Sequence, residues 1–419
     1  MNAADVIVVG GGPAGASAAH ALASANVDVL VLDRARFPRP KPCAECLSPE
    51  ASRILHRMGA LEALERAGAP QLAGMVVRAP NGAHIRGRYR AGHGFRAFRD
   101  RGLSVRREVL DHLLLQRAGA AGARVHEGAR VVDLLRDGAG RVRGVIAMDG
   151  DGRRVAHEAA LVIGADGLNS VVAARLGLRR RLPWPRRVAL VAHYRGVTDV
   201  SAYGEMHVAR DGYVGIADAG DGLTTVAAVF PQRAVRDRAG DRAAFLAQWL
   251  RAQPHLAPRF AAAQAADEVR AVGPFASHAR RAWAPGALLA GDAADFFDPF
   301  TGEGIYAALR GGELAAEHAR AALAAPSARK ADAALAAYHF AYRREFRGKW
   351  AVERAIGAVV ANAALIDRAA AACERDPALA DLLVGVCGDF VPPRALMRPS
   401  VLFALFARPA RAPRTVRLA

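Results

Sequence analysis

The stretch VIVVGGGPAG, residues 6–15, decides the fold. Its first four residues are apolar and β-branched, which predicts a buried strand, and the glycines then turn the chain sharply into a helix. Gly10 permits the tight turn, Gly12 has no Cβ to keep a pyrophosphate from the backbone, and Gly15 lets the helix pack closely on the strand. The phosphates of a dinucleotide would then lie at the positive N-terminus of that helix.

A second apolar strand, Val27 to Leu32, follows the helix and ends at Asp33. The carboxylate of Asp33 is placed to accept hydrogen bonds from both hydroxyls of a ribose. Strand, helix and strand therefore predict a dinucleotide-binding βαβ unit, which by itself fits either FAD or NAD(P). The residues of this unit that we expect to bind the cofactor are Gly10, Gly12, Pro13, Ala14, Gly15, Asp33 and Arg34.

The positive charge of the chain is large but spread out. The 419 residues include 58 basic and 40 acidic side chains, a formal net charge of +18, and only three of the basic residues are lysines. Richness in arginine and alanine is typical of a GC-rich bacterial genome, and the arginines are scattered instead of forming one dense tract. We therefore expect no nucleic-acid binding, and at most a weak attraction to anionic lipid or substrate.

Four cysteines are too few for a secreted disulfide framework in a chain of this length. The N-terminus enters the first strand almost at once and has no signal-peptide pattern. No apolar run approaches the roughly 20 residues of a membrane span. We expect a cytoplasmic protein that is soluble or peripheral to the inner membrane. We expect no metal site, because Cys43 and Cys46 have no second pair at zinc-binding spacing.

Two later strand ends carry glycine and aspartate. One apolar strand runs into Asp166 and Gly167, and another ends in Gly291 and Asp292. An aspartate at the carboxyl end of a strand is placed to bind ribityl or ribose hydroxyls. We expect both junctions to belong to the nucleotide-binding domain.

The segment TGEG at residues 301–304 opens a helix shortly after Asp292. Gly302 and Gly304 would let a flat ring approach the backbone at the positive end of that helix. A reduced flavin needs its negative charge stabilised at such a place. The residues that we expect at the reacting end of the cofactor are Pro299, Gly302, Glu303, Gly304 and Ile305.

Residues 188–230 alternate apolar and polar positions in about four strands, which predicts an antiparallel sheet inserted into the nucleotide-binding domain. An Asn-Gly turn at Asn81 predicts a separate hairpin. The expected fold is α/β, with a discontinuous Rossmann-like domain, an inserted antiparallel substrate domain and a C-terminal helical region. The expected boundaries are 1–73, 101–182 and 276–328 for the first domain, 74–100 and 183–275 for the second, and 329–419 for the helical region.

The three glycine and aspartate segments, in this order and at these separations, resemble the FAD-dependent oxidoreductases of the p-hydroxybenzoate hydroxylase type. Within that superfamily, residues 41–49 (KPCAECLSP) and 295–312 are most similar to the geranylgeranyl reductase-like branch. The resemblance covers about the first 325 residues. It implies that FAD is the resident cofactor and that NAD(P)H binds transiently as reductant. It also implies that Arg107 contacts the phosphate or ribityl part of FAD.

The chain departs from two relatives of that superfamily. Residues 212–218 (GYVGIAD) keep the tyrosine of the substrate motif of geranylgeranyl reductases but lack its Trp and Phe-Pro. A flavin halogenase would show a Trp-x-Trp element, and none of the four tryptophans has such a partner. These departures weigh against prenyl reduction and against halogenation.

The resemblance also implies that the inserted sheet forms the substrate pocket above the flavin. Tyr213 is the first candidate for a catalytic or substrate contact. About half of the side chains on a two-faced sheet point away from the pocket, so the other candidates on the sheet are weaker. These are His193, Tyr194, Tyr203 and His207, while Phe296, Phe297 and Phe300 are expected to line a dry pocket.

Two segments keep several interpretations. Cys43 and Cys46 have the spacing of a redox pair, but pocket lining by one thiol and simple packing are alternatives. The tail, residues 381–419, mixes apolar residues with arginines. It is expected to form a helical cap over the substrate domain, or an interfacial attachment that admits a lipid-like substrate.

The favoured function at this stage is an FAD-dependent monooxygenase that uses NAD(P)H to hydroxylate an aromatic or lipid-like small molecule. The nearest alternative is a reductase of double bonds in a prenyl chain. The third is a non-catalytic flavin-binding carrier or sensor.

Overall fold

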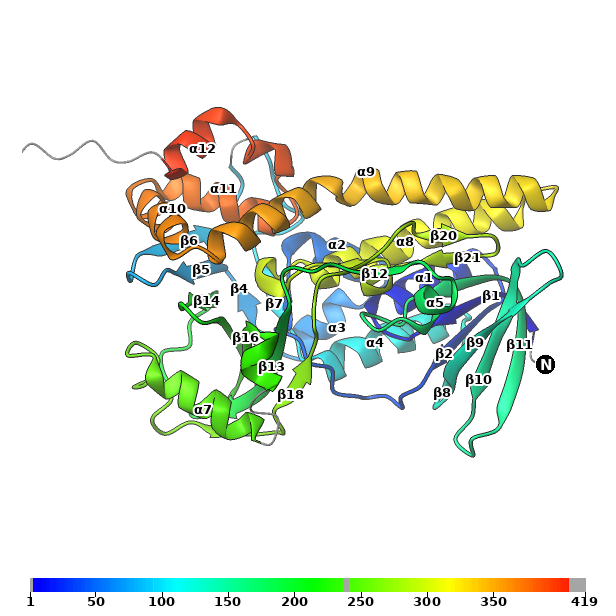
Figure 1. Cartoon of the computed structure of the whole chain (residues 1–419), viewed down its shortest axis with the longest axis horizontal. Coiled ribbons are helices and arrows are strands. Elements are labelled where there is room, and N and C mark those ends of the chain that lie inside the picture. The colour runs from blue at the N-terminus through cyan, green and yellow to red at the C-terminus, as the bar shows by residue number, and fades with distance from the viewer. Residues whose placement is uncertain (1–2, 93, 237–240, 407–419) are drawn as a thin grey trace, which may run out of the picture.

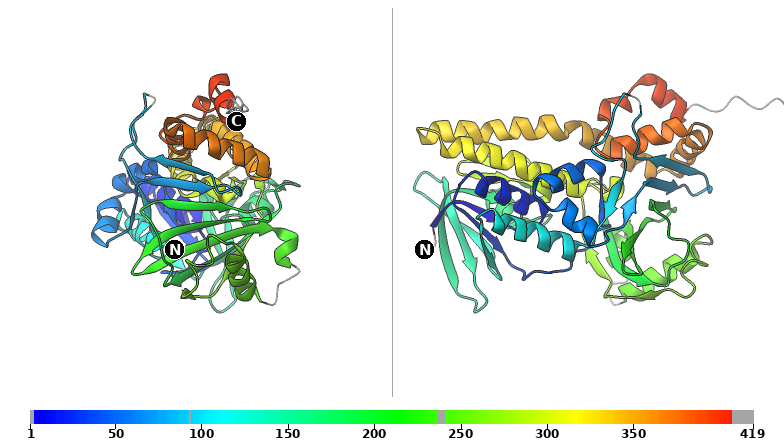
Figure 2. Two further views of the ribbon diagram at one scale, coloured as in Figure 1. Left: turned by 90° about the vertical axis from the view of Figure 1, so that its left-hand side faces the viewer. Right: turned by 180° about the vertical axis from the view of Figure 1, so that it is seen from behind.

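A computed structural model describes residues 3–92, 94–236 and 241–406. One large sheet lies at one end of the molecule and a second at the other, and the long helix α9 (Ala328–Val360) runs along the side of both (Figure 1). Figure 2 shows the same arrangement from the side and from behind. Residues 407–419, which belong to the expected C-terminal region, lie outside the described residues.

The first sheet has the strand order β20-β21-β11-β1-β2-β8, and all pairings from β21 to β8 are parallel. Val6 to Val9 of β1 are buried, which is typical of a parallel strand with helices on both faces. The strands β9 and β10 continue it as an antiparallel ribbon beside β11. The strands are β1 (Ala3–Val9), β2 (Val29–Asp33), β8 (Arg124–Glu127), β9 (Arg130–Arg136), β10 (Val142–Met148), β11 (Arg154–Gly164), β20 (Trp283–Ala284) and β21 (Ala287–Leu289).

Helices α1 (Pro13–Ala23) and α8 (Gly304–Leu323) pack closely because small residues face each other. A Cβ at Gly312 would lie 2.3 Å from the carbonyl oxygen of Ala14. The Ser17 hydroxyl donates a hydrogen bond of 2.8 Å to the carbonyl of Leu309. This contact joins the helix after the glycine fingerprint to the helix after the 301–304 segment.

The second sheet has the order β17-β13-β16-β15-β14-β5-β6, and β18 also pairs with β13. The four central strands and the hairpin are antiparallel as predicted, but β14 and β5 run parallel, so the sheet is mixed. The alternation of apolar and polar residues within a strand does not depend on the direction of its neighbour. The parallel pairing of β14 with the distant hairpin could therefore not be predicted from it. The strands are β5 (Gly74–Arg78), β6 (His84–Arg88), β13 (Arg187–Arg195), β14 (Gly204–Val208), β15 (Tyr213–Gly220), β16 (Leu223–Pro231), β17 (Gln264–Ala265) and β18 (Arg270–Val272).

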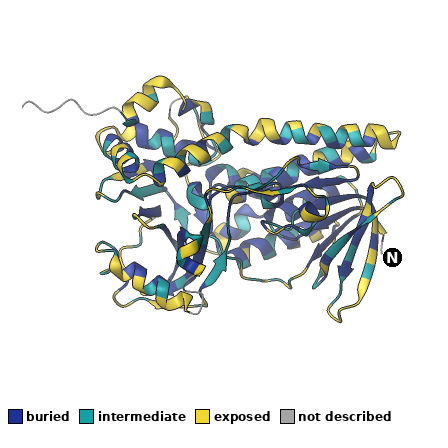
Figure 3. Cartoon of the chain, in the orientation of Figure 1, coloured by how far each residue is buried: buried dark blue, intermediate teal, exposed yellow. Residues whose placement is uncertain are grey.

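Helices cover both faces of the second sheet. Leu246 and Trp249 of α7 (Arg242–Ala252) pack on one face. On the other side, α10 (Ala363–Arg375) and α11 (Pro377–Cys387) lie against β6. The helical cap is thus present in the described part of the tail. Figure 3 shows exposed residues along the outer sides of α9 and α12 (Pro399–Phe406).

Shorter elements connect these layers. The helices are α2 (Pro49–Arg57), α3 (Leu61–Arg66), α4 (Arg107–Ala120), α5 (Val171–Arg175) and α6 (Gln232–Arg236), with 3-10 turns η1 (Gly291–Ala293), η2 (Pro299–Thr301) and η3 (Pro393–Ala395). The strands form two small sheets, β3 (Cys46–Leu47), β7 (Gly102–Ser104) and β4 (Gln71–Leu72), and β12 (Arg179–Arg181), β19 (Ser277–Ala279) and β22 (Asp295–Phe296).

In the described part of the chain, no single helix is both long and apolar enough to cross a bilayer. Helices α9 and α10 reach the required length and composition only when taken together, and the chain bends by 107° between them.

Candidate functional site

A cavity of 1140 Å³ runs from the glycine fingerprint to the second sheet. It joins the two helix N-termini described above, since residues at the start of α1 and of α8 both line it. Sixteen of the residues predicted for the cofactor or the chemistry line this cavity: Gly10, Gly12, Pro13, Ala14, Asp33, Arg34, Arg107, Asp166, Gly167, Tyr213, Gly291, Asp292, Pro299, Gly302, Gly304 and Ile305.

Two predicted residues lie behind the cavity wall instead of lining it. A Cβ at Gly15 would lie 1.8 Å from the carbonyl oxygen of Gly10, so this glycine serves the packing of helix on strand. The Glu303 carboxylate lies 3.1 Å from Nζ of Lys349, which also pairs with Asp389. Burial raises the pKa of Glu303 well above its usual range. Of the two, Glu303 was expected to be catalytic, and the structure directs its side chain into this buried ion cluster.

The fingerprint end of the cavity has room and charge for phosphates. Gly10 has a φ of +101°, and a Cβ at Gly12 would meet only arginine nitrogens, 3.6 Å away on Arg39 and 3.9 Å away on Arg107. Both arginines are held by Asp111: Arg107 makes two bonds of 2.7 Å and Arg39 one ion pair of 3.2 Å. These positive groups beside an open helix N-terminus fit a pyrophosphate.

Asp33 already supports the turn that it faces. Its Oδ2 accepts a hydrogen bond of 2.7 Å from the backbone N–H of Gly11, and its Oδ1 accepts one of 2.8 Å from Ala35. A carboxylate has about four acceptor positions, so two remain for ribose hydroxyls. The predicted ribose contact therefore remains compatible with this geometry.

The middle of the cavity carries two half-buried carboxylates, Asp166 and Asp292. Oδ1 of Asp166 is buried without a hydrogen-bond partner among the described residues, although Oδ2 accepts a bond of 2.6 Å from the N–H of Val171. Burial raises the pKa of Asp292, against the opposing charges of Lys41 and Arg107. Unsatisfied acceptors of this kind match the ribityl and ribose hydroxyls of FAD.

The loop before α8 forms the far end of the cavity. Gly302 has a φ of +72°, and no described atom lies within 4 Å of the place where its Cβ would stand. The Asp298 side chain accepts from the N–H of Phe300 at 3.1 Å and so shapes η2. An open backbone surface at the N-terminus of a long helix suits a flat ring that becomes anionic on reduction. The residues present thus fit FAD along the whole cavity.

The second sheet closes the cavity with apolar side chains. From β13 to β16 these are Ala189, Val191, Met206, Ala227 and Val229, and Phe275, Phe296 and Phe297 continue the wall. Phe300, predicted to line the pocket, packs edge-on against the Tyr213 ring instead, with ring centroids 5.0 Å apart.

The other candidates on the sheet are placed elsewhere. Four candidates predicted on this sheet do not line the cavity: His193, Tyr194, Tyr203 and His207. Tyr203 and His207 line a separate hollow near β6, and Tyr194 packs against Phe260 on the opposite face. Only His193 reaches the cavity indirectly, through a glutamate.

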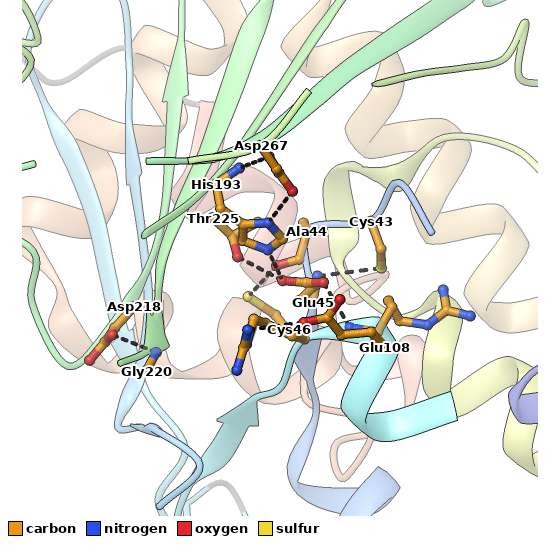
Figure 4. A network of polar contacts seen from close by, with 12 residues as sticks. Cys43, Ala44, Glu45, Cys46, Glu108, His193, Asp218, Gly220, Thr225 and Asp267 are labelled. Atoms are coloured by element: carbon orange, nitrogen blue, oxygen red, sulfur yellow. Dashed lines mark hydrogen bonds and ion pairs between the residues drawn. The ribbon is translucent and has the colours of Figure 1, made fainter. Parts of the chain in front are cut away.

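Sequence reasoning missed that glutamate. Glu45 lines the cavity, and its carboxylate lies 2.9 Å from Nε2 of His193, whose Nδ1 lies 2.8 Å from Asp267 (Figure 4). The hydrogen bond to Glu45 raises the pKa of His193 to about 9, against the effect of burial, and Asp267 adds to it. Glu45 lies in the segment that carried the reductase resemblance, but its partners are distant in sequence.

Two further carboxyls in the cavity also went unnoticed. Burial raises the pKa of Asp295 to about 7 and that of Glu353 to about 8. Asp295 is part of a segment that the sequence singled out, whereas Glu353 sits in the long helix α9 with no motif around it. Both residues line the cavity.

Cys43 and Cys46 line the cavity as free thiols. Cys43 Sγ accepts from the N–H of Glu45 at 3.3 Å, and Cys46 donates to the carbonyl of Ala44 at 3.4 Å. Burial raises the pKa of both thiols, that of Cys46 to about 12. Because the reactive form of cysteine is the thiolate, this environment favours the pocket-lining interpretation over the redox one.

Known proteins are similar to this chain over most of its length. A family model described as "FAD binding domain" matches residues 3–345. Digeranylgeranylglycerophospholipid reductase 2 of Methanopyrus kandleri is 34% identical over 330 residues, 76% of this chain and 77% of that protein.

Solved structures share the fold. A myxobacterial chondrochloren halogenase superposes with a TM-score of 0.76 at 26% identity, covering 83% of this chain and 80% of that one. A geranylgeranyl bacteriochlorophyll reductase-like protein from Thermoplasma acidophilum superposes with a TM-score of 0.72 at 21% identity, covering 96% and 95%.

Proposed function

Because the chain belongs to the FAD-binding-domain family of flavoenzymes, we propose that it reduces carbon–carbon double bonds in a lipid-like, prenyl-type substrate, with NAD(P)H as a transient reductant. This choice reverses the order expected from the sequence, where hydroxylation ranked first. The apolar wall of the second sheet carries the proposal.

That wall offers a substrate little to hydrogen-bond with. Among the described residues of the sheet that line the cavity, Tyr213 alone carries a side-chain hydroxyl, and it donates to Oδ1 of Asp298 at 2.6 Å. Burial, with the nearby Asp298 carboxylate, raises the pKa of Tyr213 well above its usual range, so the phenol keeps its proton. A phenolic substrate would have to find its polar partner away from this wall, at Asp295 or Glu353, whereas a hydrocarbon chain gains from each apolar contact of the wall.

FAD bound in the cavity would supply hydride to the substrate after reduction by NAD(P)H. The residues of the chain would bind and orient. Arg39 and Arg107 would face the pyrophosphate, Asp292 and Asp166 the hydroxyls, and the backbone at Gly302 the ring. Phe296 and Phe297 would exclude water from the reacting end.

The names of relatives support the same reading. The archaeal protein that shares three quarters of its length with this chain is a digeranylgeranylglycerophospholipid reductase. A menaquinone reductase of Mycobacterium tuberculosis is 35% identical over 205 residues, 46% of this chain. The first name describes reduction of a geranylgeranyl-bearing lipid, and the second describes reduction of a quinone.

Hydroxylation of an aromatic or lipid-like substrate is the second candidate. The dry, phenylalanine-rich wall that favours an apolar substrate would equally protect an oxygenated flavin from water. The need for molecular oxygen distinguishes the two candidate reactions, because a hydroxylase consumes oxygen and a double-bond reductase does not.

We further propose that the C-terminal region contacts the membrane and admits the substrate from it. Phe403 of α12 is 75% exposed, Met397 and Leu402 are exposed beside it, and Arg394 and Arg398 lie in the same segment. Apolar residues flanked by arginines suit the surface of an anionic bilayer.

The test is an anaerobic assay of the FAD-loaded protein with NAD(P)H and a prenyl lipid. We expect NAD(P)H oxidation that depends on the lipid and continues without oxygen. Activity that appears only when oxygen is admitted would favour the hydroxylase, and bound FAD without any substrate-stimulated NAD(P)H oxidation would overturn both.

A further inference from the structure

Glu45, His193 and Asp267 form a continuous chain of hydrogen bonds between the protein surface and the flavin cavity (Figure 4). The exposed fraction of the side chain falls from 29% at Asp267 to 18% at His193 and 4% at Glu45. Glu45 lines the cavity, while the other two residues stand behind it. The histidine is thus the link between a cavity-facing acid and solvent.

Glu45 is held in one orientation from several sides. Its Oε1 accepts a hydrogen bond of 2.8 Å from the N–H of Arg107, and its Oε2 accepts one of 2.8 Å from the hydroxyl of Thr225. Its backbone has a φ of +62°, which is rare for a residue with a side chain and is strained. Such strain, fixed by surrounding contacts, is found preferentially at functional sites.

The charges around His193 favour its protonated form. Glu45 and Asp267 face its two ring nitrogens. Two arginines contact these carboxylates and not His193 itself. Arg270 pairs with Asp267 at 3.3 Å, and the backbone N–H of Arg107 donates to Glu45. The imidazole therefore holds a proton at neutral pH, next to a carboxylate that lines the cavity.

We propose that Glu45 is the catalytic residue that passes a proton to the substrate, that the His193 imidazolium supplies this proton, and that Asp267 orients the ring. This assignment rests on the proposed double-bond reduction. One carbon of the double bond forms a C–H bond with the hydride that reduced FAD supplies. The π electron pair forms the second C–H bond with a proton that comes from Nε2 of the His193 imidazolium by way of the Glu45 carboxylate, which leaves Glu45 ionised as before and His193 neutral.

His193 then regains its proton. The neutral ring takes it up from water, because the His193 side chain is 18% exposed. Asp267 accepts from Nδ1, fixes the ring and stabilises the imidazolium. His193 and Asp267 are positioning and relay residues, because they act through Glu45.

The experiment compares Glu45→Gln, His193→Gln and Asp267→Asn with the matched control His207→Gln. His207 also lies 2.9 Å from a glutamate, Glu205, on the same sheet, but does not line the flavin cavity. We expect Glu45→Gln and His193→Gln to lower turnover of a prenyl lipid by roughly 10²-fold, within the range for general acids, with FAD occupancy and flavin reduction by NAD(P)H unchanged. His207→Gln should leave turnover unchanged.

The titration of His193, followed by NMR on the FAD-loaded protein, is the readout that does not depend on activity. We expect it near pH 9 in the wild type and closer to the ordinary 6.5 in Asp267→Asn. Because the relay needs the imidazolium, the fall of turnover on the alkaline side should move to lower pH in Asp267→Asn.

Full turnover in Glu45→Gln and His193→Gln, beside an active wild type, would overturn the relay. Should those variants fail to fold, Asp267→Asn decides the matter, and an unmoved pH profile would overturn the relay. A wild type that reduces no prenyl double bond would instead overturn the proposed function.

Discussion

The Tyr213 hydroxyl donates a hydrogen bond of 2.6 Å to Oδ1 of Asp298. Tyr213 belongs to the second sheet, and Asp298 shapes the loop at the far end of the cavity, where its Oδ2 also pairs with Arg187 at 3.0 Å. The bond therefore sets the distance between the substrate wall and the place where the flavin ring is expected.

Replacing Tyr213 by Phe removes this bond but keeps the ring against Phe300. We expect a loss of about 1.5–3 kcal/mol in the free energy of unfolding, because the bond is to a carboxylate, and less than about a tenfold change in turnover, because Asp298 keeps Arg187. Urea unfolding and steady-state kinetics measure the two effects. A drop in turnover of roughly 10²–10⁴ would mean that the hydroxyl itself transfers a proton.

The Gly12→Val variant should fold but lose FAD. A side chain there would occupy the space that Arg39 and Arg107 face, which we assign to the pyrophosphate. The flavin absorbance of the purified protein and its circular dichroism report the two properties. The control is Gly119→Ala in α4, where no described atom lies within 4 Å of the added Cβ, and full FAD retention in Gly12→Val would refute the assignment.

Asp292→Asn should leave the stability of the protein without FAD unchanged or higher, but it should lower the affinity for FAD. Burial raises the pKa of Asp292, so in the folded protein without FAD its ionised form is destabilising, and this penalty appears as pH rises above the ordinary pKa of 3.8. At pH 7 the variant without FAD should thus be at least as stable as the wild type. FAD affinity should fall by about tenfold or more, since a hydrogen bond to a charged group contributes about 1.5–3 kcal/mol. Thermal melting with and without added FAD tests both, and equal affinity would remove Asp292 from the site.

Lys349→Met should be strongly destabilising. It leaves the carboxylates of Glu303 and Asp389 buried without their cation, a change that costs about 3–5 kcal/mol. The matched control is Arg57→Met. Arg57 forms a surface ion pair with Glu313, and such a pair contributes less than about 1 kcal/mol to the free energy of unfolding. Equal losses of unfolding free energy in the two variants would show that Glu303 does not belong to a buried ion cluster with Lys349.

Phe403→Ser should abolish binding to vesicles that contain anionic lipid. The matched control is Phe340→Ser, because Phe340 is 71% exposed on α9, outside the segment proposed for membrane contact. Vesicle flotation measures the difference. Retained binding of Phe403→Ser, or equal loss in the control, would contradict the proposed membrane contact.

The cofactor end of the site was predictable because each part is local. A strand followed by Gly10 and Gly12, and an aspartate at a strand end, fix their own geometry within a few residues. Parallel strands of one sheet then bring Asp166 and Asp292 to the same edge, since both follow strands that pair with each other.

The reacting end was harder to predict, because distant partners decide where side chains point. Glu303 turns away from the cavity because Lys349 is buried beside it. Phe300 leaves the wall to pack on Tyr213. Glu45 and His193 are 148 residues apart, and nothing in either local pattern predicts that they meet.

The most direct test of the proposed function is the mass of the product formed from a prenyl lipid by the FAD-loaded protein with NAD(P)H. The proposed reduction predicts a product heavier than the substrate by a pair of hydrogens for each double bond consumed. A product heavier by one oxygen, with its double bonds intact, would contradict it.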